Sequence, residues 1–165
     1  MKRLYLLSGL ILSVAAVSIG LNADSTDEKK RQSVYHKLDS LISWSPKTLR
    51  YTIDWPEVIN ILDSTKGSVI VNDYRLSDRP LLNIAALNND FLGTKIFLAV
   101  YKANPNLFDG ISYNPLMYAV EHKNIPMIKL LLRYKADPDL KNRAGVSARD
   151  WASASPNILK LFPKK

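Results

Sequence analysis

The chain has 165 residues, of which 47% are hydrophobic and 23% charged, and it contains no cysteine. This composition excludes a collagen-like chain, a disulfide-stapled scaffold and a wholly disordered protein. With 23 basic against 15 acidic residues the net charge is +8. That charge suits an acidic partner, an anionic membrane surface or nucleic acid, and by itself it does not choose among them.

The first segment has the pattern of a secretory signal peptide. A basic start at Met1 to Arg3 precedes an uncharged, mostly apolar run from residue 4 to 21, followed by a polar stretch. We expect residues 1–23 to be a signal peptide cleaved after Ala23, with Gly20 as a second candidate site. The competing interpretation is a retained anchor, because the run approaches the roughly 20 residues that span a bilayer.

A period of 33 residues organises the second half of the chain. The stretches Tyr101–Asn106 and Tyr134–Asp139 are identical apart from Asn-to-Asp exchanges, and Asp109 corresponds to Asn142 at the same offset. Self-similarity at a fixed period of this length predicts supersecondary units that stack on one another.

Each unit carries start signals for two short helices. Asn114 can cap a first helix with proline in its first turn, and Asn124 can cap a second helix in the same way. Neither helix can bury its apolar face alone, so the units must stack. The positions expected to be buried at helix contacts are Ala103, Leu116, Ala119, Leu130, Leu131, Ala136 and Ala152.

The segments 114–119, 127–132 and 135–139 together resemble an ankyrin repeat. What this resemblance implies is an all-α fold, an ankyrin-repeat solenoid of roughly three to four helix-turn-helix repeats with an N-terminal helical cap. The expected divisions are a signal peptide at residues 1–23, a helical cap at 24–50 and an ankyrin-repeat domain at 51–165.

Toward the N-terminus the repeat pattern weakens, and an amphipathic stripe of apolar residues takes its place. The expected elements in chain order are a capping helix at about 26–43, a second helix at 55–62, an irregular exit loop at 67–72, a helix pair at 79–86 and 94–101, and a C-terminal cap ending between residues 159 and 162.

The sequence contains no pattern typical of catalysis or cofactor binding. Its two histidines, His36 and His122, cannot form a multi-histidine metal site, and nucleophile elbows, phosphate loops and dinucleotide turns are absent. Asp137 and Asp139 are expected to bond to local backbone in a turn. We therefore expect no enzyme, cofactor or metal. Scattered basic residues and an export signal also argue against nucleic acid.

Repeat scaffolds present an extended surface and regularly spaced loops that suit the binding of another protein. In combining an export signal with a short ankyrin array, the chain resembles bacterial periplasmic immunity proteins. That resemblance implies a partner that is a secreted, envelope-acting toxin such as a phospholipase, here with an acidic surface. The alternatives are a periplasmic adaptor or chaperone-like partner and a membrane-tethered structural protein. No membrane span is expected after signal cleavage.

The binding residues are expected where repeats of this kind leave side chains free of packing. Exposed aromatic residues among Arg and Lys favour strong contacts, and Phe108 and Tyr113 are expected to bind without contributing to stability. For Tyr101 and Tyr134, packing between repeats is an equal alternative. The expected partner-binding residues are Tyr74, Arg75, Arg79, Tyr101, Phe108, Ile111, Tyr113, Glu121, His122, Tyr134, Lys141, Arg143 and Val146.

Overall fold

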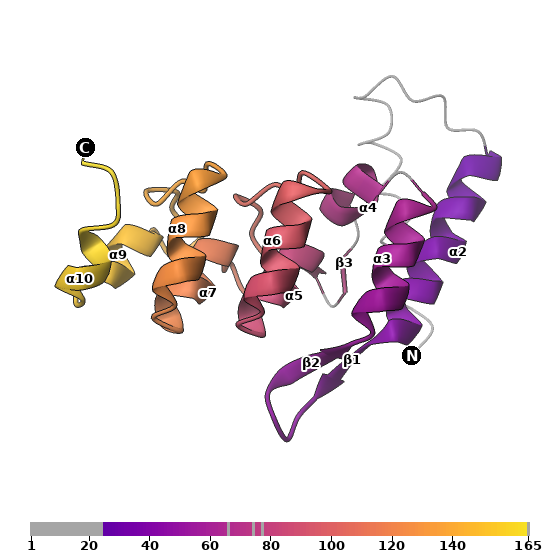
Figure 1. The fold of residues 1–165 in the computed structure, drawn as a ribbon, viewed down its shortest axis with the longest axis horizontal. Helices are drawn as coiled ribbons and strands as arrows, with labels where there is room; N and C mark the ends of the chain where they lie inside the picture. The colour runs from indigo at the N-terminus through magenta and orange to yellow at the C-terminus, as the bar shows by residue number, and fades with distance from the viewer. Residues whose placement is uncertain (1–24, 66, 74, 77, 165) are drawn as a thin grey trace. The chain divides into compact units, whose positions relative to one another are not determined.

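The computed structural model describes residues 25–65, 67–73, 75–76 and 78–164 (Figure 1). The expected signal peptide lies outside these residues. The chain divides into two units, Met1–Lys37 and Leu38–Lys165. In chain order the elements are α2 (Ser25–Leu41), β1 (Ile42–Ser45), β2 (Arg50–Ile53), α3 (Trp55–Asp63), α4 (Gly67–Asp73), β3 (Arg75–Leu76), β4 (Arg79–Pro80), α5 (Leu81–Leu87), α6 (Phe91–Ala99), α7 (Pro115–Glu121), α8 (Ile125–Arg133), α9 (Ala148–Ala152) and α10 (Pro156–Leu159).

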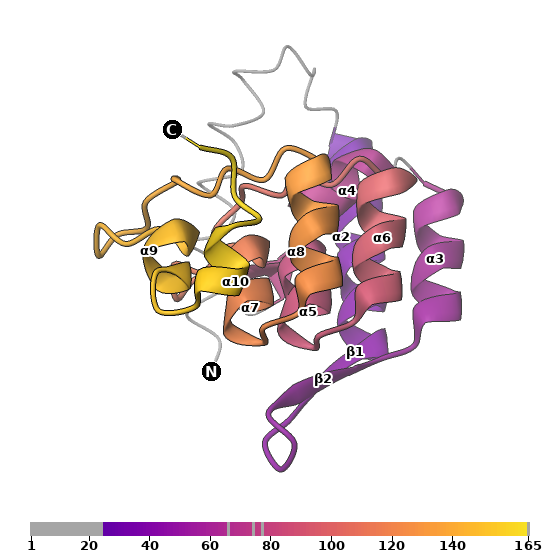
Figure 2. The ribbon, with the colours of Figure 1, turned by 60° about the vertical axis from the view of Figure 1, so that its left-hand side comes forward.

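From residue 81 onward the helices form the pairs α5–α6, α7–α8 and α9–α10 (Figure 1). Short turns at residues 88–90, 122–124 and 153–155 join the two helices of each pair. The first helices stack, with α5 against α7 and α7 against α9, and α6 packs against α8 (Figure 2). This part of the second unit therefore has the expected helix-turn-helix arrangement.

Side-chain caps mark where α6, α7 and α8 begin. Asn114 accepts a hydrogen bond from the Met117 N–H at 2.9 Å, and Asn124 accepts one from the Met127 N–H at 3.0 Å. Both caps confirm the prediction, and proline stands in the first turn of each helix. Asp90 caps α6 in the same way, so α6 begins before the expected residue 94.

Small and apolar residues repeat at the helix contacts as predicted. The four alanines one period apart or in equivalent positions, Ala103, Ala119, Ala136 and Ala152, are all buried, as are Leu116 and Leu131. Leu130 is only half-buried, and the prediction for it was wrong. The buried stripe of α8 instead comprises Met127, Ile128 and Leu131, which leaves Leu130 at the margin of the apolar face.

Two antiparallel hairpins correct the expected all-α class. β1 pairs with β2 from Ile42 opposite Ile53 to Ser45 opposite Arg50, and β3 pairs with β4. Isoleucine, tryptophan, tyrosine and threonine in the first hairpin favour strands, and α2 therefore ends at Leu41 instead of continuing to about residue 43. The expected boundary between cap and repeats at residue 50 falls inside this hairpin, and the three expected divisions remain predictions.

The segment expected to be an irregular exit loop is helical. Gly67–Asp73 form α4, which packs against α3 and α5. Its Ile70 and Val71 are buried, so tertiary burial overrides the weak helix propensity of β-branched residues. Similarly, β4 occupies the first two residues of the helix expected at 79–86. The helix expected at 55–62 is confirmed as α3.

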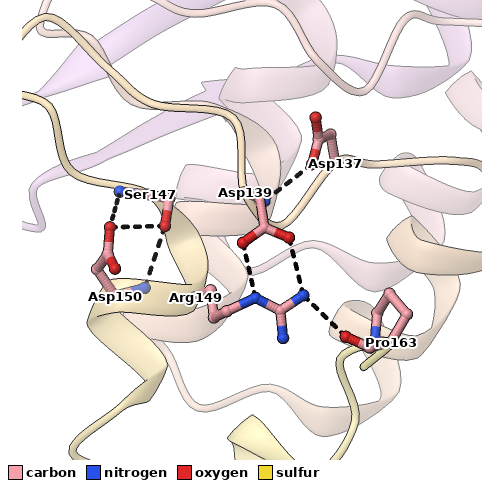
Figure 3. A network of polar contacts seen from close by, with 6 residues as sticks. All are labelled: Asp137, Asp139, Ser147, Arg149, Asp150 and Pro163. Atoms are coloured by element: carbon pink, nitrogen blue, oxygen red, sulfur yellow. Dashed lines mark hydrogen bonds and ion pairs between the residues drawn. The ribbon is translucent and has the colours of Figure 1, made fainter. Parts of the chain in front are cut away.

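A polar network holds the last helices against the preceding exit turn (Figure 3). Arg149 donates to both carboxylate oxygens of Asp139 at 2.8 and 2.9 Å and to the Pro163 carbonyl at 2.9 Å. Asp137 accepts from the Asp139 N–H at 2.8 Å, which confirms its expected bond to local backbone. Asp139 has a role that was not expected, because its bidentate ion pair with Arg149 connects the turn to α9.

Candidate functional site

Three loops of the second unit face the same region at the beginning of the first helices. They are the β3–β4 hairpin, the loop before α7 and the loop before α9. The last two have the same internal geometry one period apart. Asp109 accepts from the Ile111 and Tyr113 N–H groups at 3.1 and 2.9 Å, and Asn142 accepts from Ala144 and Val146 at 3.0 Å each.

The same two loops need a left-handed residue at equivalent positions. Ser112 has φ 66° and Gly145 has φ 74°, and each donates its N–H at 2.9 Å to the carbonyl of the residue that anchors its loop. Repeated Asx-anchored turns therefore present the loop tips at a fixed spacing.

Asp109 is the buried centre of the first of these loops. Besides its two backbone bonds, its Oδ2 accepts from the Tyr118 hydroxyl at 2.5 Å and lies 3.2 Å from Nε of Arg79, as an ion pair without hydrogen-bond alignment. Arg79 in turn donates from Nη1 to the Tyr51 hydroxyl at 3.1 Å. One carboxylate thus connects the loop to α7, to β4 and, through Arg79, to β2.

The buried Tyr118 hydroxyl is expected to make the fold less stable at alkaline pH. Burial, followed by the hydrogen bond to Asp109, raises the pKa of Tyr118 above its ordinary value, which is about 10. Because the neutral phenol is favoured in the fold, its stabilisation is complete below about pH 10 and is lost as the pH rises through the raised pKa. Urea unfolding at a series of pH values should show this loss, and Tyr118→Phe should reduce it. An equally steep alkaline loss in Tyr118→Phe would contradict the assignment.

A buried asparagine of α5 positions both ends of the loop before α7. Asn83 donates from Nδ2 to the carbonyls of Leu107 and Tyr113 at 3.1 and 2.9 Å and is 0% exposed. The repeat pattern did not indicate this role, because Asn83 stands where apolar residues alternate along the first helix. Its function becomes visible only when the next repeat is stacked on α5.

A polar hollow of about 310 Å³ lies between the loop tips, with Asp78, Phe108, Asp109, Gly110 and Arg143 as its lining. Gly110 donates its N–H to the Asp78 carbonyl at 3.1 Å. A Cβ at position 110 would lie 2.8 Å from the Cβ of Asp78, so glycine permits this close approach. The side chains of Asp78 and Arg143 form no hydrogen bond or ion pair with the described part of the chain.

The structure brings together some of the predicted binding residues and separates others. The exposed ones are Ile111, Glu121, His122, Lys141 and Arg143, and the half-buried ones are Arg79, Phe108, Tyr113, Tyr134 and Val146, whereas Tyr101 is buried. Tyr74 and the side chain of Arg75 lie outside the described residues. We name as the loop surface the residues Asp78, Phe108, Gly110, Ile111, Lys141 and Arg143.

Two predicted binding residues have internal roles. Tyr101 is 5% exposed, and its hydroxyl donates to Asp63 at 2.6 Å, so the packing alternative is the one that holds. Burial, then the bond to Asp63, raises the pKa of Tyr101. The guanidinium of Arg79 pairs with Asp109 and donates to the Tyr51 hydroxyl, so it stabilises the fold. Neither residue belongs to the loop surface.

Tyr113 also packs inside the second unit. Its ring lies 4.7 Å from that of Trp151, edge to face, and 5.3 Å from that of Tyr118. Aromatic pairs of this geometry contribute to stability beyond their buried area. The expectation that Tyr113 can be replaced without a change in stability is therefore corrected, and Phe108 becomes the preferred aromatic contact.

Glu121 and His122 lie at the end of α7 opposite to the loop surface. Nε2 of His122 is 2.9 Å from the Leu87 carbonyl, and Asn124 donates to Asn89 at 2.7 Å. These contacts join the turns of successive helix pairs. The predicted binding residues thus form two groups, one on the loops and one on the turns.

Within the described residues, no group of three or more His, Cys, Asp or Glu side chains is placed to hold a metal ion. None of the described helices has the length and apolar character to cross a membrane. Asp109, the one carboxylate buried in the loop region, is occupied by hydrogen bonds that stabilise the fold.

Comparison with known proteins agrees with the geometry of the helix pairs. Residues 98–152 match the family model described as ankyrin repeats (many copies). This stretch is similar to ankyrin repeats. An ankyrin repeat protein of Acanthamoeba polyphaga mimivirus is 41% identical over 49 residues, which cover 30% of this chain and 12% of that relative.

The matched ankyrin stretch includes α7, α8, α9 and both Asx-anchored loops. Ankyrin repeats are modules of protein–protein interaction and are typically not enzymes. In a stacked array each repeat contacts its neighbours through the helices, and the loops remain accessible. On the loop surface, Lys141 and Arg143 are exposed and have no ion-pair partner in the described part of the chain.

Proposed function

We propose that the chain is a protein-binding module that holds an acidic partner on its loop surface. The observation that carries the proposal is the hollow whose lining includes both the exposed Arg143 and the aromatic residue Phe108. Arg143 has no partner in the described part of the chain. Aromatic residues and arginine are the side chains that most often dominate protein interfaces.

The surroundings of the hollow support a partner with negative charge and an apolar anchor. Ile111 is 56% exposed at the tip of the loop before α7, and Lys141 is exposed on the next loop. Neither the lysine nor the arginine is neutralised by a described side chain. The rigid turns mean that little conformational entropy is lost when these tips are contacted.

The binding test uses substitutions that leave the core intact. Phe108→Ala should weaken binding by roughly 1–3 kcal/mol, and Arg143→Glu should slow association with an acidic partner, more strongly at low salt. Proteins captured by immobilised wild-type chain from an envelope extract are compared with those captured by each variant. Binding rates of a purified captured protein are then measured at two ionic strengths.

Lys160→Glu is the matched control, because Lys160 is exposed at the C-cap of α10 and does not belong to the loop surface. It changes the net charge by the same amount as Arg143→Glu. Partners retained by Lys160→Glu and lost by the loop variants support the proposal. Unchanged binding by the combined Phe108→Ala and Arg143→Glu variant would contradict the loop surface as the site.

The biological role that we propose is that of an exported immunity protein that neutralises a secreted toxin, such as a phospholipase, in the periplasm. Its support is the export pattern at residues 1–23 together with an ankyrin-repeat segment of interaction type. Mass spectrometry of the mature N-terminus tests the export step, with a start near Asp24 expected. Recovery of the uncleaved chain from the cytosol would contradict it.

A protection assay tests the immunity role. Cells that express the chain should survive a toxin encoded beside it, and Phe108→Ala should reduce the protection in parallel with binding. A captured partner that belongs to the resident envelope proteins, with no toxic activity, would instead support the adaptor role.

A further inference from the structure

The connection between α2 and α3 is longer than the corresponding turns of the later helix pairs. Those pairs are joined by residues 88–90, 122–124 and 153–155, whereas residues 42–54 separate α2 from α3. The additional residues form the β1–β2 hairpin, which projects beyond the helices of the second unit (Figure 1). We name its exposed tip, residues 44–50, the hairpin tip.

The base of this hairpin is held firmly. Asn88 accepts from the Tyr51 N–H at 2.8 Å and donates to the Tyr51 carbonyl at 2.7 Å. The Tyr51 ring is 6% exposed, and its hydroxyl accepts from Arg79. Because Asn88 satisfies both backbone groups of Tyr51, it acts like a neighbouring strand, and the tip is presented in a defined direction.

The hairpin tip exposes large apolar side chains. Trp44 is 44% exposed and Leu49 is 67% exposed. Leu49 adopts φ 54°, a left-handed conformation that is costly for a branched apolar residue and that glycine or asparagine would adopt more easily. Its aliphatic side chain contributes little packing in return, and strain of this kind is a pointer to function.

The charged side chains of the hairpin tip are all positive. Lys47 and Arg50 are exposed, and neither side chain forms a hydrogen bond or ion pair with the described part of the chain. Between Asp39 and Asp54 the sequence contains no acidic residue, and Asp54 is engaged as the N-cap of α3. An exposed tryptophan and leucine on the same hairpin as two free cations suit the boundary between lipid headgroups and acyl chains.

We propose that the hairpin tip inserts into the surface of an anionic phospholipid bilayer. Lys47 and Arg50 contact the headgroups, while Trp44 and Leu49 enter the interfacial layer. Phe91 and Leu92, 40% and 66% exposed, are further exposed apolar residues at the start of α6, after the turn whose Asn88 holds Tyr51. This contact is separate from the loop surface, and each can fail without the other.

The test places a fluorophore at the hairpin tip. The chain contains no cysteine, so Thr48→Cys provides a single attachment site for an environment-sensitive dye in the full chain. The readout must be local, because the apolar run at residues 4–21 can itself associate with lipid. Vesicles of phosphatidylcholine are compared with vesicles that contain phosphatidylglycerol. We expect a blue shift and an increase in emission only with the anionic vesicles.

Three variants identify the residues responsible. Lys47→Ala with Arg50→Ala should weaken the apparent affinity roughly 30-fold, since each basic residue near an anionic surface contributes about 1 kcal/mol. Leu49→Gly should also reduce the signal while its melting temperature stays the same or rises, because glycine relieves the positive φ. Phe108→Ala on the loop surface should leave the vesicle signal unchanged. A dye at Lys160→Cys should not respond.

The proposal is overturned if the dye at position 48 remains in water when anionic vesicles are added. It is also overturned by an equal response to neutral vesicles, or by a response that survives the loss of both Lys47 and Arg50. A dye that responds to the captured protein partner and not to lipid would identify the tip as a protein contact. Vesicle binding that persists when Phe108→Ala abolishes partner capture would separate this proposal from the proposed function.

Discussion

Replacing Asp109 by alanine is expected to lower the free energy of unfolding by about 3–5 kcal/mol. The carboxylate is 4% exposed and accepts from two loop N–H groups and from the Tyr118 hydroxyl. Its removal also leaves the Arg79 guanidinium without its ion-pair partner. Several buried donors would be unsatisfied at once, and such losses exceed the value of one hydrogen bond. Urea unfolding followed by far-ultraviolet circular dichroism measures the change.

The repeat itself supplies the controls for Asp109. Asparagine occupies the equivalent position 142 and forms the same loop bonds, so Asp109→Asn should keep the turn and lose only the charge. Its destabilisation should be smaller than that of Asp109→Ala. Asn142→Ala removes the turn bonds without an ion pair and should also cost less. Equal effects of all three substitutions would mean that the ionic contacts of Asp109 contribute nothing to stability.

Replacing Ala119 by leucine is expected to destabilise the fold by about 1–3 kcal/mol. Ala119 is 0% exposed on α7, a helix that packs against α5, α8 and α9. Protein interiors have almost no free volume at such contacts, so the additional carbons must displace neighbouring helices. Thermal unfolding measures the effect as a lowered melting temperature.

Ala154→Leu is the matched control for Ala119→Leu, because Ala154 is exposed in the turn between α9 and α10. It introduces the same side chain without a packing conflict, and its melting temperature should change little. An unchanged melting temperature for Ala119→Leu would show that the helix pairs are not packed as the structure has them.

The difference between Tyr101 and Phe108 shows why a candidate site could be predicted only in part. Both are aromatic residues in or beside the loops, and composition gives no reason to separate them. Tyr101 is buried because α3 brings Asp63 to its hydroxyl, and α3 lies well before it in the chain. Contacts of this kind depend on stacking between repeats, and the local pattern does not contain them.

The sequence by itself determined the helix pair α7–α8, its two asparagine caps and the four buried alanines. Caps and prolines act on the next few residues, and small residues at a fixed period report the helix contacts, so both signals are local. The 33-residue period also predicted that Asp109 and Asn142 play equivalent parts in their loops.

Only the tertiary structure decided the parts that depend on contacts between distant segments. Burial of Ile70 and Val71 makes α4 a helix, and Asn88, in the turn after α5, holds the β1–β2 hairpin by two hydrogen bonds to Tyr51. The contacts of Asp109 are with residues of α7, of β4 and of its own loop. Long-range packing can override local propensity because it buries whole side chains, whereas propensity differences between ordinary residues amount to less than about 1 kcal/mol each.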